Sequence, residues 1–148
     1  IPEPVIEAIQ SSPPGWLWVF REHPVTPPDV SAALKEDIIR TGTKSTLVLG
    51  KHDLPLPMIL RHSNHHVTSS SSCIYEATAF DVPTTFVGRE AAWLHAYFIE
   101  NDLATLVENG TQLIQTIQHE ESVKRLSKAP RTIEASPELM QQVVETWF

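Results

Sequence analysis

The stretch at residues 67–88, VTSSSSCIYEATAFDVPTTFVG, constrains the fold of this chain more than any other. It predicts a short strand, a serine-rich turn, a helix over residues 73–80 and a second strand over residues 84–87. β-Branched residues favour the strands, and Pro83 stops the helix. One of the turn serines is expected to cap the helix. Unpaired N–H groups at the start of the helix, together with the serine hydroxyls, suit an anion such as phosphate.

A second strong signal is the apolar run WLWVF at residues 16–20. Turn-forming residues bound it, so it predicts a strand that is buried on both faces, as parallel sheets require. Asp29 or Ser31 is the expected cap of the next helix, and Gly42 its end. The remaining helices are expected over residues 1–10, 29–40, 58–63, 90–101, 111–126 and 137–147, and the remaining strands over residues 46–49 and 103–107.

Strands therefore alternate with helices long enough to serve as crossover connections. This order predicts a Rossmann-like α/β fold with a doubly wound parallel sheet. A chain of 148 residues has the length of one domain, which we expect to span residues 1–148. No GxGxxG motif follows a predicted strand, so NAD or FAD binding is not favoured.

Arg21 and His23 follow the WLWVF run in the segment REHP. In open α/β sheets ligands bind outside the carboxyl ends of the strands, where these two side chains would lie. Arg21 offers a permanent charge and a fork that suits phosphate, and His23 is a hydrogen-bond donor that titrates near physiological pH. The alternative is that both are ordinary surface residues of a strand-to-helix loop.

Composition excludes several classes of protein. A net charge of −7 argues against a nucleic-acid binder, which usually shows a basic face. The single cysteine rules out an internal disulfide and favours a reducing compartment such as the cytoplasm. We see no signal peptide and no apolar run of about 20 residues that would span a membrane. The sequence begins with Ile1 rather than Met, so it is expected to be a piece of a longer protein.

Four histidines crowd one region, at His52, His62, His65 and His66. Their spacing matches no zinc motif and includes no cysteine partner, so we expect solvent-facing or packing histidines and no metal. Cys73 stands at a helix start, where a thiolate would be stabilised, but a small buried residue is the favoured interpretation over a Cys–His nucleophile.

The central stretch resembles the C-terminal, nucleotide-binding half of GT-B glycosyltransferases, in particular enzymes that build bacterial capsule and lipopolysaccharide. The family pattern is a Ser/Thr turn, Glu-Ala, a spacer, an acid or glycine, and Val-Pro before a strand. The residues that fit it are Ser71, Ser72, Glu76, Ala77, Asp81, Val82 and Pro83. Many members have glycine in place of Asp81. The His-Pro pair after a strand is similar to a motif of the same enzymes and of bacterial sialyltransferases.

This resemblance implies a donor-binding domain for a nucleotide-activated sugar or polyol. Ser70, Ser71 and Ser72 would contact the donor phosphates, and Glu76 would hold the ribose. His23, with Arg21, would hold or protonate the leaving phosphate. The resemblance implies no resident cofactor, and dependence on a divalent cation stays open.

The resemblance also implies partners. A missing N-terminal GT-B domain would supply the acceptor site and the general base, so this chain alone would bind without turnover. Residues 132–148 would form a C-terminal helix that packs on that domain. The acceptor would be a polysaccharide or a lipid-linked glycan, handled in the cytoplasm or peripherally at the inner membrane through other parts of the protein.

Three alternatives remain from the sequence. A nucleotide-sugar 2-epimerase shares the fold, but those enzymes carry Gly-Gly and paired glutamates where this chain has Ser-Ser and one glutamate. A non-catalytic nucleotide-binding or interaction domain is the second alternative. A Rossmann-like domain of unrelated function is the third. The nucleotide base, the sugar, the acceptor and the stereochemical outcome are not determined.

Overall fold

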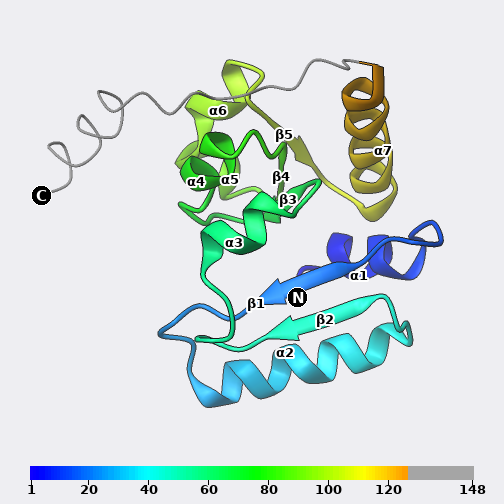
Figure 1. The fold of residues 1–148 in the computed structure, drawn as a ribbon, viewed down its shortest axis with the longest axis vertical. Coiled ribbons are helices and arrows are strands. Elements are labelled where there is room, and N and C mark those ends of the chain that lie inside the picture. The colour runs from blue at the N-terminus through cyan, green and yellow to red at the C-terminus, as the bar shows by residue number, and fades with distance from the viewer. Residues whose placement is uncertain (127–148) are drawn as a thin grey trace, which may run out of the picture.

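A computed structural model describes residues 1–126, with side chains to residue 123 (Figure 1). The helix expected over residues 137–147, and the partner contact expected of residues 132–148, therefore lie outside the described residues. The elements in chain order are α1 (Glu3–Gln10), β1 (Trp18–Arg21), α2 (Pro28–Thr41), β2 (Thr46–Leu49), α3 (Leu56–Arg61), β3 (His66–Thr68), α4 (Ile74–Ala79), β4 (Thr84–Val87), α5 (Ala91–Leu94), α6 (Ala96–Glu100), β5 (Ala104–Val107) and α7 (Gly110–Leu126).

This alternation of helices and strands confirms the predicted α/β class. The strands over residues 46–49 and 84–87 have the predicted bounds, because β-branched residues make up half of the first segment and three of the four positions of the second. Gly42 ends α2 with a left-handed φ of 68°, as predicted, since glycine adopts this conformation without strain. Among the described helices, none is long and apolar enough to cross a membrane.

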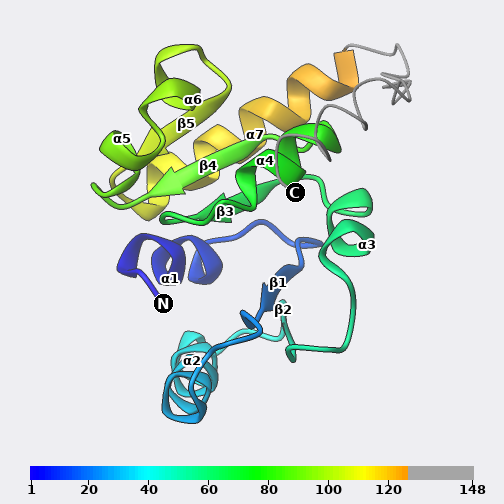
Figure 2. The same cartoon turned by 90° about the vertical axis from the view of Figure 1, so that its left-hand side faces the viewer.

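The strands form two parallel sheets rather than the single sheet that the sequence predicts. One sheet contains β1 and β2, with Phe20 level with Val48. The other has the order β3-β4-β5, in which Val67 is level with Thr85 and Thr85 with Thr105. Figure 2 shows β1, β2 and α2 at one end of the molecule, and the three-stranded sheet with α5 and α6 at the other.

The largest core cluster joins the two ends of the described chain. Its buried residues come from α1, α7 and the ends of β4 and β5, and they are Val5, Ala8, Ile9, Val87, Val107, Leu113 and Ile117. The N–H of Gly110, at the start of α7, donates a 2.8 Å hydrogen bond to the Glu7 carboxylate of α1. Separate clusters lie under α4–α6 and between α3 and α4.

The prediction that the WLWVF strand is buried on both faces is wrong. Trp18 and Phe20 pack against the largest core cluster, whereas the alternate side chains of Leu17 and Val19 are 61% and 40% exposed. Successive side chains of a strand point to opposite faces. Only the face of β1 that carries Trp18 and Phe20 has a covering layer, so the side chains on the other face stay partly exposed.

The helix expected over residues 90–101 is interrupted at His95, whose φ of −125° separates α5 from α6. The His95 side chain is buried, its ring stacks on Phe86 with 4.8 Å between centroids, and its Nε2 lies 3.1 Å from the Ser70 carbonyl oxygen. These contacts with distant residues override the helical pattern.

The expected side-chain caps of two helices are also absent. Pro27 takes the N-cap position of α2, and Ser31 instead donates its hydroxyl to the buried Glu22. Proline suits the helix start because its missing N–H would be unpaired there in any case. Cys73 takes the N-cap position of α4, where no side chain accepts a hydrogen bond from the first turn.

Candidate functional site

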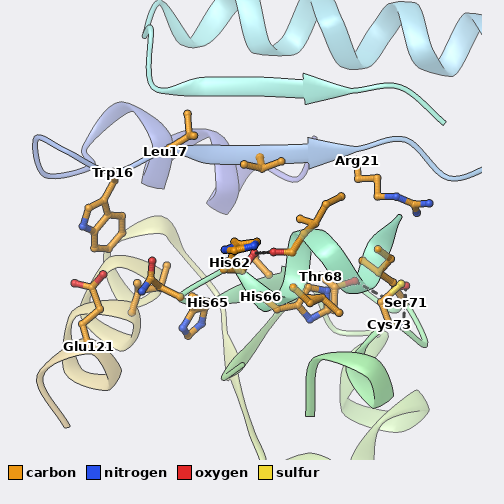
Figure 3. A pocket seen from close by; sticks show the side chains of 18 of the residues that line it. Trp16, Leu17, Arg21, His62, His65, His66, Thr68, Ser71, Cys73 and Glu121 are labelled. Atoms are coloured by element: carbon orange, nitrogen blue, oxygen red, sulfur yellow. Dashed lines mark hydrogen bonds between the residues drawn. The ribbon is translucent and has the colours of Figure 1, made fainter. Parts of the chain in front are cut away.

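A cleft of about 640 Å³ lies between the two sheets (Figure 3). β1 and β3 form facing walls, with Val19 on one and Val67 on the other. Leu60 of α3 and Ile117 of α7 close the space between them. The volume is within the roughly 300–1,000 Å³ that small-molecule sites occupy. The cleft is therefore the candidate site of this chain.

The two strand-end motifs predicted from the sequence meet at one end of this cleft. Arg21 and His23 follow β1, and Ser71 follows β3, and all three line the cleft. Figure 3 shows Arg21, Ser71 and Cys73 at one end, while Trp16 and Glu121 lie at the other. The carboxyl ends of β1 and β3 are thus together, which is the place where open α/β sheets bind ligands.

Arg21 brings a positive charge without a carboxylate partner. Its Nε donates to the Leu54 carbonyl over 3.4 Å, which leaves both Nη groups without a partner in the described part of the chain. The ion pairs within residues 1–123 all use Asp37, and none involves Arg21. The unpaired guanidinium fork is suited to two oxygens of one anion.

His23 has a defined tautomer when it is neutral. The backbone N–H of Val25 donates to its Nδ1 over 3.3 Å, so the ring proton is on Nε2. The side chain is exposed and lines the cleft. Nε2–H can therefore donate to a bound anion next to Arg21.

The turn after β3 is held by its own hydroxyls. The Ser71 N–H donates to Thr68 Oγ1 over 3.1 Å, and the Cys73 N–H donates to Ser71 Oγ over 3.2 Å. These two N–H groups are therefore already paired and are not the anion donors that the sequence predicts. The Ser71 hydroxyl uses its oxygen as an acceptor in this turn, so its own hydrogen remains available to a ligand.

Three of the predicted site residues lie outside the walls of the cleft. Ser70 and Ser72 are exposed, and their carbonyls accept hydrogen bonds from His95 Nε2 and from the Tyr75 N–H. Glu76 is exposed on α4. The phosphate role of Ser70 and Ser72 and the ribose role of Glu76 stay predictions.

The structure adds His66 to the site. Burial lowers the pKa of His66 from its usual 6.5 to about 4, so the ring is neutral at physiological pH. Its Nδ1 lies 3.1 Å from the Thr84 hydroxyl, which fixes the ring in the wall of the cleft. His62 and Thr68 also line the cleft. The sequence favoured solvent-facing or packing roles for these histidines and did not place His66 at the site. Within the described residues, no group of three His, Cys, Asp or Glu side chains is arranged to hold a metal ion.

Comparisons with family models, with curated proteins and with solved structures found no match for this chain.

Proposed function

We propose that this chain is the donor-binding domain of a glycosyltransferase of bacterial surface-polysaccharide synthesis, with the doubly wound architecture of one half of a GT-B fold. One observation carries the proposal. Arg21 and His23, on one strand end, and Ser71, on another, were predicted separately from the sequence, and they line the same end of one cleft.

In this proposal the cleft binds a nucleotide-activated sugar or polyol. The diphosphate lies between the Arg21 guanidinium, His23 Nε2 and the Ser71 hydroxyl, which are three donors on the two walls. The apolar walls, which include Leu56, accommodate the rest of the donor. Charge-assisted hydrogen bonds to phosphate are about twice as strong as neutral ones, so these donors dominate affinity.

The same donors have a chemical role in transfer. With a sugar donor, an acceptor hydroxyl attacks the anomeric carbon, the bond from that carbon to the phosphate oxygen breaks, and negative charge develops on the departing nucleotide. Arg21 and His23 stabilise this charge by donating hydrogen bonds, from the guanidinium and from Nε2–H, to the departing phosphate. The acceptor's proton goes to a base on the partner domain, so turnover needs that domain.

The test is a thermal-shift panel with UDP, CDP, GDP, ADP and inorganic pyrophosphate, each with and without Mg²⁺. A ligand at about 100 times its Kd adds roughly 2.7 kcal/mol of stability, which raises the Tm of a domain of this size by about 5–10 °C. We expect one nucleoside diphosphate to give such a shift. The proposal is wrong if the Tm responds to none of the five compounds.

A matched pair of arginine variants locates the bound phosphate. Arg21→Ala should weaken binding of the selected nucleotide by about 10- to 100-fold, since a hydrogen bond to a charged group contributes roughly 1.5–3 kcal/mol. Arg61→Ala removes an exposed arginine that does not line the cleft and should change Kd less than twofold. Equal losses in both variants would point to nonspecific charge attraction.

A further inference from the structure

β1 has one paired edge and one unpaired edge. The N–H groups of Trp18 and Glu22 donate to carbonyls of the β2 segment over 2.8 and 3.0 Å. In a parallel ladder the N–H and C=O of one residue point to the same side, and successive residues alternate. The backbone N–H and C=O of Phe20 therefore also point toward β2, whereas those of Val19 and Arg21 point away from β2, toward the cleft.

β3 has the complementary arrangement. The N–H of His66 donates to the Pro83 carbonyl over 2.8 Å, so the backbone groups of His66 point toward β4. Those of Thr68, two residues further along the strand, point the same way. The backbone N–H and C=O of Val67, between them, consequently point away from β4 and toward the cleft. Two sheet edges with unpaired backbone groups thus face the same space.

The two edges also have compatible directions and faces. In Figure 3 the chain runs the same way along β1, from Trp16 to Arg21, as along the β3 segment, from His65 to Ser71. The side chains of Phe20 and Val67 both pack against the largest core cluster. Residues that are level in a parallel pair have their side chains on the same face, so these two can become neighbours.

We propose that β1 and β3 pair directly in a closed form of this protein, with Phe20 level with Val67. The result is one five-stranded parallel sheet of order β2-β1-β3-β4-β5. In this register the Val67 N–H donates to the Val19 carbonyl, and the Arg21 N–H donates to the Val67 carbonyl. The last residues of the two strands, Arg21 and Thr68, become level.

Closure changes the site in a defined way. Backbone N–H and C=O groups in the middle of the cleft give up hydrogen bonds to water and form them with each other. This pairing removes the space between Val19 and Val67. The crevice beyond the carboxyl ends remains, because Arg21, His23 and Ser71 lie where the strands stop. The order of strands reverses direction between β1 and β3, and a reversal of this kind marks the ligand site of a doubly wound sheet. Closure itself does not rest on the proposed function.

Two double-cysteine variants in a Cys73→Ser background test the proposal without a ligand. In the closed sheet the Cα atoms of residues 19 and 66 are about 4.8 Å apart, within the roughly 4.4–6.8 Å that a disulfide spans. Val19→Cys with His66→Cys should therefore form a disulfide under mild oxidation. Leu17→Cys with His66→Cys is the control, because a shift of two residues along the strand separates the pair by about 8 Å.

We expect the 19–66 disulfide to form at least tenfold faster than the 17–66 disulfide. Equal rates, or a faster 17–66 pair, would overturn the proposal. Hydrogen exchange of the unmodified chain is a second test, which does not depend on the folding of any variant. The amides of Arg21 and Val67 should exchange at least tenfold more slowly than that of Leu17, which has no partner in the closed register. Three equal exchange rates would also overturn the proposal.

Discussion

The backbone N–H of Cys73 donates a 3.2 Å hydrogen bond to the hydroxyl oxygen of Ser71. This bond orients the Ser71 side chain at the end of the cleft, so that its own hydrogen is free to point toward a ligand. One hydroxyl thereby shapes the turn before α4 and, in the proposed function, contacts a donor phosphate.

Ser71→Ala should weaken nucleotide binding about tenfold, because it removes one hydrogen bond to a charged group, and should lower the free energy of unfolding by about 1 kcal/mol. If the cleft holds the phosphate, Ser72→Ala should change the Kd less than twofold, because the Ser72 side chain is exposed and outside the cleft, and this result would end the predicted phosphate role of Ser72. Calorimetric titration of both variants measures the difference. A larger effect at Ser72 than at Ser71 would show that Ser72, and not Ser71, contacts the phosphate.

Glu76→Ala separates the ribose role from the phosphate role. If Glu76 holds the ribose diol, the variant should bind a nucleoside diphosphate roughly tenfold more weakly and inorganic pyrophosphate as well as the unmodified chain does. Glu100→Ala, which removes an exposed carboxylate of α6, is the control for loss of negative charge. Unchanged affinity for the nucleotide in Glu76→Ala would end the ribose assignment.

Gly110→Ala should be strongly destabilising. A Cβ at this position would lie 2.5 Å from the Glu7 Cβ and 2.8 Å from the Ala8 nitrogen, so α1 and α7 would have to separate. Overpacking of this kind typically costs 1–3 kcal/mol, and we expect about 3 kcal/mol by urea denaturation. Gly50→Ala meets only the flexible Asp53 side chain at 3.4 Å and should cost less than about 1 kcal/mol. Similar costs for the two variants would contradict the close approach of the helices.

The His66 ring should make the fold sensitive to acid. Its pKa is lowered from 6.5 to about 4, so between these pH values the unfolded chain binds more protons than the folded one. The free energy of unfolding therefore falls as the pH drops below 6.5, by about 2 kcal/mol between pH 7.5 and pH 5. His66→Asn should reduce this loss, whereas His52→Asn, in an exposed loop, should not. The same pH dependence in all three proteins would place the titrating group elsewhere.

Local signals determine much of this fold. The TLVL segment that begins at Thr46 and the VPTTFV segment form strands β2 and β4 at the predicted positions, and the turn residue Gly42 ends α2. Apart from the division of one expected helix into α5 and α6, the order of elements through α7 also follows from alternating patterns along the chain. Patterns of this kind depend on neighbours within a few residues, which is why the sequence alone reveals them.

Contacts between distant residues account for what the sequence did not predict. The break at His95 depends on Ser70 and Phe86, and the loss of the Ser31 cap depends on the buried Glu22. The apolar run around Val19 has the same sequence pattern whether its second face is buried or exposed, so the sequence could not show that this face is partly exposed. That Arg21 and Ser71 line one cleft could be predicted only because both follow strands that were expected to be parallel.

The packing of α1 on α7 also has a consequence for the order of folding. Glu7 and Gly110 are separated by 103 residues, and the core that their helices share includes Ile9 and Leu113. A core of such high contact order cannot assemble until the chain through α7 is available, so α1 leaves the ribosome long before its partner. Until then Val5 and Ile9 of α1 lack the α7 side chains that cover them in the folded chain, so chaperones can bind this segment during synthesis.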